Sequence, residues 1–581
     1  MKKALLLPAF VASALLAQSV PPPKDSPTQS SPAPTPVATK PTTASQQEPS
    51  RPFPPVSERV EVSVTNIDVV VTDSKGNRVP GLTKDDFEVF QDNIPQVVTN
   101  FYAVTGGKVL LEDGKTVPLD SPEAVAEVPR QLKSRYIVYI DNLNIQPQNR
   151  NRMFKRLKEF LSATVGPQAE AMVVTYNRSL KVKRKFTSEK GDVLAAVEQT
   201  ELETGGGTTQ AGERRDALGR INESHSEGEA NQIARTYAQS LRNDMQFAVD
   251  ALKTTLDGLA GVEGRKILIY VSEGLPASAG AELFDAITRK FSGSSALESI
   301  EFDLNSKYLT IAQAANANGV TIWALDASGL AADEFISAET RYMENRPSSF
   351  QMRQNTQAPL VMLAEQTGGM AAINTNDWKR SLDELSKDFS NFYSIGYRTS
   401  RAATDRTHSV EVRLKRKGLT VRSRKGLLEK STETRVVETV YSALDYPRDE
   451  NPLNMRVEVQ ESHAYGDEGF VLPVQLYLPI GRLGLVPSGD RYEASYFVYV
   501  LVRDAKGDKS DLEVRRETVT VPAARLPDAQ KKVQPYKLDL IVRPGAQRLS
   551  IAVRDGATNS TSYFQKNVFI SVLPKETKKA G

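Results

Sequence analysis

RYIVYID at residues 135–141 is a run of apolar and aromatic side chains that ends on an acidic residue. Two later runs have the same form, KILIYVSE at 266–273 and VTIWALD at 320–326. Continuous apolar runs, rather than alternating ones, are typical of strands covered on both faces, as in a parallel sheet wrapped by helices. Ligands of such sheets bind beyond the carboxyl ends of the strands. Asp141 and Glu273, which close the first two runs, therefore mark the best candidate site.

Helical patterns separate these strands. Residues 152–165 place apolar side chains on one face, and residues 227–260 repeat them at spacings of three and four. Strand–helix alternation continues from residue 132 to residue 398, and it requires a parallel sheet with right-handed crossovers. We therefore expect a multidomain chain whose central domain, 132–398, is a doubly wound, Rossmann-like α/β fold.

The segments on either side of the central domain read as β structure. Alternating strands and Gly-containing turns predict a small N-terminal β domain at 57–104. A β-hairpin extension is expected at 399–430, and a helix with a linker at 431–453. At least seven strands in 454–574 predict a C-terminal β-sandwich.

The first residues have the form of an export signal. Lys2 and Lys3 precede about a dozen apolar residues and then small ones, so 1–19 reads as a cleaved signal peptide. Residues 20–56 are rich in Pro, Ser and Thr and cannot bury enough apolar surface to order themselves, which predicts a disordered linker. The expected location is therefore secreted or periplasmic, with no membrane span after cleavage.

The amino-acid composition limits the kinds of functional site that the chain can form. The chain has 0 cysteines, which excludes disulfides and thiolate sites, and a formal net charge of +3, which gives no argument for nucleic-acid binding. Its 3 histidines lie in separate segments, and no G-x-S-x-G nucleophile motif occurs. These features disfavour an enzyme, although a secreted hydrolase with accessory β domains stays an alternative.

Several motifs together resemble one family. The chain is similar to von Willebrand factor type A (VWA) domains, and more closely to the VWFA-related proteins of the acidobacterial type. The resemblance covers roughly residues 60–430, with the C-terminal sandwich fitting the same layout. It is carried by VVVTDSKGNRVPGLTKDDFEVFQDN at 69–93, YIDNLN at 139–144, GRKILIYVSEGLP at 264–276, LAEQTGGMA at 363–371, YSIGYR at 393–398 and VRSRKG at 421–426.

The resemblance implies a metal-dependent adhesion site, in which Mg²⁺ or Mn²⁺ joins the domain to an acidic group of a protein ligand. The motif of this site consists of D-x-S-x-S, a threonine and an aspartate. Asp141, Thr208 and Glu273 match as metal ligands, with glutamate in place of aspartate. Leu143 and Ile145 occupy the serine positions and cannot coordinate a cation. The implied site is degenerate, so any metal would bind weakly.

Asn142 and Asn144 lie one residue out of register with those serine positions, and they complete the expected ligand-binding face with Asp141, Thr208 and Glu273. The alternative is that Asp141 and Glu273 are polar strand ends that hold no metal. Both readings lead to the same expectation, a protein that mediates protein–protein interaction or adhesion at the cell envelope. A purely structural envelope protein is the remaining alternative.

Overall fold

The computed structural model describes residues 64–110, 115–119, 132–167, 169–293, 295–330, 349–398, 404–466 and 469–571. All of them belong to one compact unit, Val60–Gly581. The expected signal peptide at 1–19 and linker at 20–56 lie outside the described residues. No helix in the described part of the chain is long and apolar enough to cross a membrane.

A six-stranded sheet forms the centre of the α/β domain, in the order β12-β11-β10-β7-β8-β9. The three apolar runs lie in β7, β10 and β11, which pair in parallel with one another. Only β9, at one edge, runs antiparallel. The strands are β7 (Ser134–Asp141), β8 (Ala169–Tyr176), β9 (Leu180–Thr187), β10 (Arg265–Ser272), β11 (Val320–Asp326) and β12 (Ala371–Ala372).

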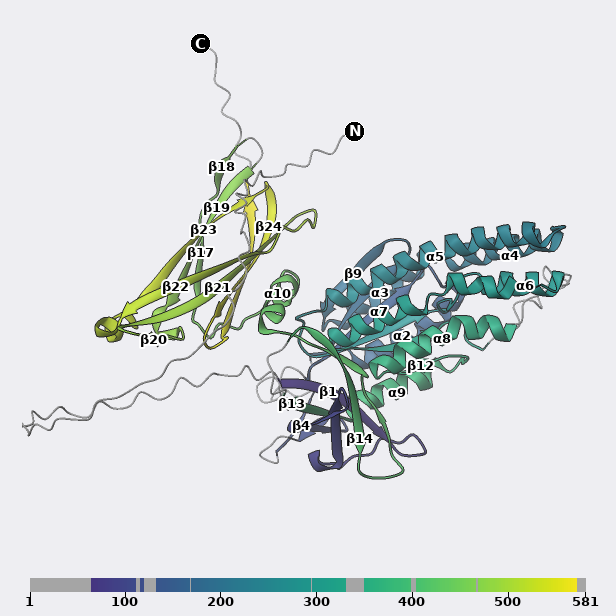
Figure 1. Ribbon diagram of the computed structural model, residues 1–581, viewed down its shortest axis with the longest axis horizontal. Helices are drawn as coiled ribbons and strands as arrows, with labels where there is room; N and C mark the ends of the chain where they lie inside the picture. The colour runs from purple at the N-terminus through teal and green to yellow at the C-terminus, as the bar shows by residue number, and fades with distance from the viewer. Residues whose placement is uncertain are drawn as a thin grey trace, which may run out of the picture. The chain divides into compact units, whose positions relative to one another are not determined.

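Helices cover both faces of this sheet (Figure 1). Alternate residues of β7 enter different cores, Ile137 and Tyr139 on one face and Tyr136 and Val138 on the other, which explains its continuous apolar run. The first core includes α4 (Gly207–Glu223), α5 (Glu227–Asp257), α6 (Ala281–Phe291), η3 (Ser295–Phe302), α7 (Asn305–Ala317) and α8 (Ser349–Thr367). The second includes α2 (Pro147–Thr164), α3 (Lys190–Glu201) and α9 (Trp378–Ser390). The expected mixed α/β class is therefore present.

The flanking β segments join each other, which differs from the sequence expectation of two separate parts. Strand β13 does not enter the parallel sheet, because it pairs antiparallel with β1 and β4 from the beginning of the chain. One sheet has the order β15-β1-β13-β4-β5-β6 and the other β16-β14-β2-β3. Their apolar faces share one core, including Ile67, Val89 and Ile395. A thin sheet cannot bury a core alone, so the two segments fold together.

The bounds of this joint β domain are as follows: β1 (Val64–Thr72), η1 (Lys84–Asp86), β2 (Phe87–Gln91), β3 (Ile94–Gln96), β4 (Val98–Thr105), β5 (Lys108–Leu110), β6 (Thr116–Pro118), β13 (Phe392–Arg398), β14 (Arg406–Leu414), β15 (Thr420–Arg422) and β16 (Gly426–Glu429).

The C-terminal strands form two antiparallel sheets around one core. One contains β17 (Arg456–Val459), β18 (His463–Tyr465), β19 (Gly469–Pro479) and β23 (Val533–Val542). The other contains β20 (Val486–Ser488), β21 (Arg491–Asp504), β22 (Glu513–Pro522), β24 (Gly545–Asp555) and β25 (Thr561–Ile570). Short helices connect strands at η5 (Ile480–Arg482), η6 (Ala523–Arg525) and α11 (Leu526–Ala529). Helix α10 (Thr432–Ala443) packs Val436 and Val440 against Tyr499 and Ala552 of these strands.

Candidate functional site

Asp141 ends β7 and is fully buried at the carboxyl edge of the parallel sheet. Its Oδ2 accepts hydrogen bonds from the Tyr270 hydroxyl (2.6 Å), Asn144 Nδ2 (2.9 Å) and the Ser272 hydroxyl (3.1 Å). Its Oδ1 accepts one from the Asn144 backbone amide (3.2 Å). Burial raises the pKa of Asp141, and these hydrogen bonds oppose the rise. Both carboxylate oxygens are therefore engaged by the protein itself.

Leu143 and Ile145, which stand at the serine positions of the motif, point away from the strand-end surface. Their exposed fractions are 1% and 0%. Leu143 packs in the core on one face of the sheet and Ile145 in the core on the other face. The loop after β7 is thus pinned by apolar burial on both sides, where a metal-binding loop would present hydroxyl groups to the cation.

Glu273 follows β10 and serves the start of α2. Its Oε1 accepts hydrogen bonds from the Gln146 backbone amide (2.8 Å) and from Asn149 Nδ2 (2.8 Å). A carboxylate at this position satisfies amide groups that have no partner within the helix, and it interacts favourably with the positive end of the helix dipole. This role accounts for an acidic residue at 273 without any metal.

Asn142 is held by a buried cation that the sequence reasoning missed. Arg150, on the first turn of α2, is 0% exposed, and its Nη1 donates to Asn142 Oδ1 (2.8 Å). Its Nη2 donates to the backbone carbonyls of Glu201 and Glu203 (both 2.9 Å). Asn142 Nδ2 donates in turn to Glu203 Oε2 (3.0 Å). The guanidinium therefore ties the loop after β7 to the connection between α3 and α4.

The glycine loop before α4 contacts the same strand-end loop directly. Gly206 donates its amide hydrogen to the Asn142 carbonyl (2.6 Å). A Cβ atom on Gly206 would lie 2.8 Å from the Leu143 carbonyl oxygen, and one on Gly207 would lie 2.6 Å from the Ile145 carbonyl carbon. These positions require glycine because two backbones touch there. Thr208 follows on the first turn of α4 and is exposed.

These side chains do not fit a six-coordinate Mg²⁺ or Mn²⁺ site. The Asp141 oxygens and Glu273 Oε1 already accept hydrogen bonds, and the serine positions are apolar. Among the described residues, no group of three or more His, Asp or Glu side chains is placed to hold a metal ion. The structure brings Asp141, Asn142, Asn144 and Glu273 together at one edge, with the main chain of the glycine loop against them.

A pocket of about 420 Å³ opens over this edge. Asn144, Gly207 and Glu273 line it, together with residues that sequence reasoning did not single out, including Gln210 of α4 and Arg353 of α8. Gln210 Nε2 is buried and has no hydrogen-bond partner among the described residues. A lone Gln or Arg near the start of a helix gives no sequence signal, because only the packing of α4 and α8 over the sheet edge places it here.

Comparison with known proteins gives no family. No protein-family model matches the chain, and no curated protein sequence matches it. Similar solved structures include BatB from Bacteroides thetaiotaomicron, with 10% identity, 44% of this chain and 98% of that chain covered, and a TM-score of 0.21. The pilus adhesin SpaC from Lactobacillus rhamnosus GG is 11% identical, with 78% of this chain and 56% of that chain covered and a TM-score of 0.24. Manganese-loaded Plasmodium vivax TRAP is 10% identical, with 51% of this chain and 95% of that chain covered and a TM-score of 0.21. TM-scores of this size carry no argument about the function of this chain.

Proposed function

We propose that this chain is an exported, non-enzymatic binding protein of the cell envelope. Its VWA-like domain holds a protein ligand in the pocket at the carboxyl edge of the sheet, and it does so without a metal ion. The observation that carries the proposal is the combination of that 420 Å³ pocket with hydrogen-bond donors that have no partner among the described residues, while the acidic groups beside it are already engaged.

The donors define the chemistry of the ligand. Gln210 Nε2 has no partner, and the Arg353 guanidinium makes no hydrogen bond or ion pair within the described part of the chain. Arg152, also on the rim, donates to the Ser328 carbonyl (3.2 Å) and stacks on Trp378, which fixes its position. Arginine recognises carboxylates through paired donors. We therefore expect an acidic side chain or chain terminus of the partner to enter the pocket.

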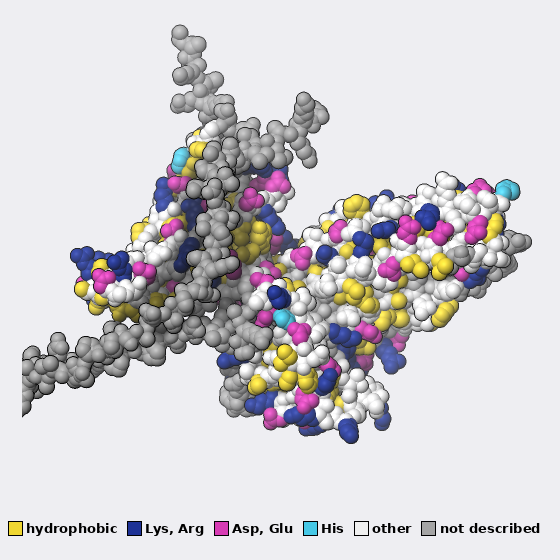
Figure 2. Space-filling view, viewed as in Figure 1, with side chains coloured by type: hydrophobic (Ala, Val, Ile, Leu, Met, Phe, Trp, Pro, Cys, Tyr) yellow, Lys and Arg dark blue, Asp and Glu magenta, His cyan; other side chains and the backbone are white. Residues whose placement is uncertain are grey.

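The surface charge supports a protein partner over a polyanion. On the face shown in Figure 2, Lys and Arg side chains are interspersed with Asp and Glu over the helices, and neither sign gathers into a continuous patch. The formal net charge is only +3. Nucleic-acid binding relies on clustered cations, so a local carboxylate contact suits this surface better.

Site-specific photo-crosslinking tests the proposal. A photoreactive residue at Gln210 should capture an envelope protein, and the same residue at Gln199, exposed on α3 across the sheet, should not. Capture should persist in a chelator. Arg353→Ala should weaken binding of the captured partner about ten- to hundredfold, the worth of a charged hydrogen bond, whereas Arg380→Ala, at an exposed position on α9, should not. Equal capture at both positions, or loss of capture in chelator, would contradict the proposal.

A further inference from the structure

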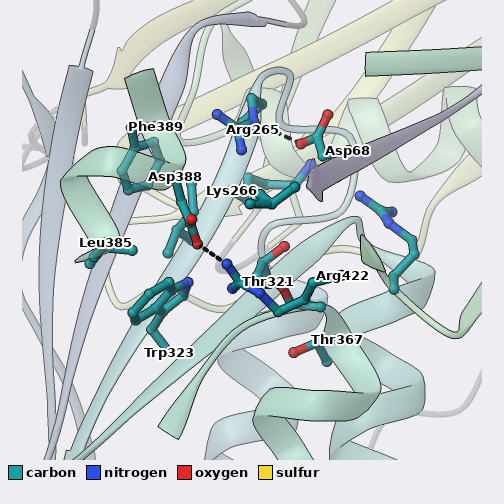
Figure 3. Close-up of a pocket in the computed structure, with 14 residues that line it drawn as sticks. Asp68, Arg265, Lys266, Thr321, Trp323, Thr367, Leu385, Asp388, Phe389 and Arg422 are labelled. Carbon is teal, nitrogen blue, oxygen red and sulfur yellow. Dashed lines mark hydrogen bonds and ion pairs between the residues drawn. The ribbon is translucent and has the colours of Figure 1, made fainter. Parts of the chain in front are cut away.

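A second cavity, of about 30 Å³, lies at the opposite, amino-terminal end of the parallel strands. Its walls come from the start of β10 and β11, from β1, from α9, from the end of α8, and from the end of β15 with the segment that follows it. The cavity therefore lies where the β domain meets the α/β domain. Figure 3 shows Lys266 between two ion pairs, Asp68 with Arg265 on one side and Asp388 with Arg422 on the other. The residues that carry the argument are Asp68, Arg265, Lys266, Asp388, Arg422 and Arg424.

The wall of this cavity carries more positive than negative charge. Four basic side chains line it, Arg265, Lys266, Arg422 and Arg424, against two acidic ones, Asp68 and Asp388. The acids are already committed, since Asp68 pairs with Arg265 (2.8 Å) and Asp388 pairs with both Arg422 and Arg78. The wall therefore has two more basic than acidic side chains, and Arg424 shares Asp68 with Arg265 at longer range.

Donors in this wall are also unused. The Arg265 side chain is 9% exposed, and its Nη1 is buried without a hydrogen-bond partner among the described residues. Within the same residues, the Arg424 guanidinium makes no hydrogen bond or ion pair, and the Lys266 ammonium donates to the Val262 carbonyl (2.5 Å). Leaving buried charged donors unpaired is costly, and bound anions or waters are the usual remedy.

We propose that this cavity binds one small inorganic anion of about the size of chloride, held by Arg265, Lys266 and Arg424. The cavity volume limits the size of the anion. A buried water needs roughly 10–15 Å³ of cavity volume, so a cavity of about 30 Å³ has room for one or two water-sized particles. A phosphorylated metabolite does not fit. The anion would bridge β1, β10 and the segment at Arg424, and so stabilise the junction of the two domains.

Lys266 makes the site sensitive to pH. Burial lowers its pKa to about 7, with further lowering by Arg424, Lys430 and Arg135 and an opposing effect of Glu438. Asp68 and Asp388 also line the cavity, and both are paired with arginines. A bound anion favours the protonated ammonium, and by linkage protonation favours the anion. The affinity for the anion should therefore be higher at pH 6 than at pH 9.

Thermal unfolding of the purified protein in different sodium salts tests the proposal. At equal sodium concentration, 100 mM chloride or bromide should raise the Tm by about 2 °C or more relative to gluconate, by mass action on the folded state. The increment should be larger at pH 6 than at pH 9. Arg424→Gln should abolish it while keeping the fold, because among the described residues the Arg424 guanidinium makes no hydrogen bond or ion pair and interacts with Asp68 only at longer range. Arg406→Gln, at an exposed position on β14, should leave the increment intact.

Chloride-35 NMR line broadening supplies a direct readout of binding. The wild-type protein should broaden the chloride signal, unlabelled bromide should reverse the broadening, and Arg424→Gln should not broaden it. The same Tm increment in wild type and Arg424→Gln would indicate general salt screening and overturn the proposal. So would stabilisation by sulfate or phosphate alone, since the bound anion would then exceed the size that the cavity allows.

Discussion

Asp141, which the sequence resemblance predicts to be a metal ligand, is engaged by four protein donors. Tyr270 and Ser272 come from the neighbouring strand β10, and Asn144 from the loop that follows β7. A buried carboxylate needs this many hydrogen bonds because desolvation opposes its ionisation. An internal hydrogen-bond network therefore engages both carboxylate oxygens of Asp141.

Metal addition should have no effect on this network. We expect millimolar Mg²⁺ or Mn²⁺ to leave the Tm of the wild-type protein unchanged, because the oxygens that would coordinate it are occupied. Differential scanning fluorimetry with and without a chelator measures this, and Asp141→Ala serves as the control without the carboxylate. Micromolar binding by calorimetry that Asp141→Ala abolishes would restore a metal-dependent mechanism.

Arg150 should be a major stabiliser of the site. Arg150→Ala removes the donor to Asn142 Oδ1 and to the Glu203 carbonyl, and leaves the Glu201 carbonyl only the longer hydrogen bond from Asn151 Nδ2 (3.4 Å). We therefore expect a loss of about 3 kcal/mol in the free energy of unfolding. Urea denaturation measures the loss. Arg156→Ala, on the same helix with a side chain that is 42% exposed and ion-paired with Glu159, should cost about 0.5 kcal/mol or less. Equal costs for the two variants would show that Arg150 does not join the loops.

Lys266 gives the stability a pH dependence of known sign. Its pKa of about 7 in the folded state lies below the ordinary lysine value of 10.5, so the folded state binds fewer protons than the unfolded state between these two pH values. The free energy of unfolding should therefore fall as the pH drops from about 10 to 7 and level off below that. Lys266→Met should flatten this slope, and Lys155→Met, at an exposed site on α2, should not. Denaturation in gluconate salts from pH 6 to pH 10 measures it.

At the scale of elements, the local sequence pattern predicted where the strands lie better than it predicted which strands pair with one another. The three apolar runs specify β7, β10 and β11, and because parallel strands end at one edge, Asp141 and Glu273 were expected to meet. YSIGYR reads equally well as a strand of any buried sheet, so its pairing with residues 64–69 has no local signal. Gln210 and Arg353 were missed for the same reason, since long-range packing places them.

The shared β domain predicts which fragments fold. A fragment of residues 60–430 should unfold cooperatively, whereas one of residues 132–398 should be poorly soluble or loosely packed. The shorter fragment keeps β13 but removes β1 and β4, exposing Ile395 and Tyr397, which are 0% exposed in the full chain. Circular dichroism melts and amide hydrogen exchange compare the two. A sharp, native-like melt of the shorter fragment would contradict the joint fold.

At the scale of the whole molecule, the C-terminal strands have a core of their own, but that core does not account for all their apolar surface. Tyr499, Leu501 and Ala552 lie outside it and pack against α10. Helix α10 has Ser431 as its N-cap, whose side chain accepts from the Thr434 amide. The boundary of this folding unit therefore lies before residue 431, and the helix that sequence reasoning placed with a linker belongs to the sandwich.

Fragments that differ only in this helix test the boundary. We expect residues 431–571 to be more stable than residues 454–571, because Val436, Val440 and Leu444 are almost fully buried and Tyr499 and Leu501 lose their cover without them. At roughly 25 cal/mol per Å² of apolar surface, covering a few large side chains contributes several kcal/mol. Urea denaturation measures the difference. Val440→Asp in the longer fragment should remove most of the added stability, whereas Glu433→Gln, on the first turn of α10, should keep it. Identical urea midpoints for the two fragments would place the helix outside the sandwich.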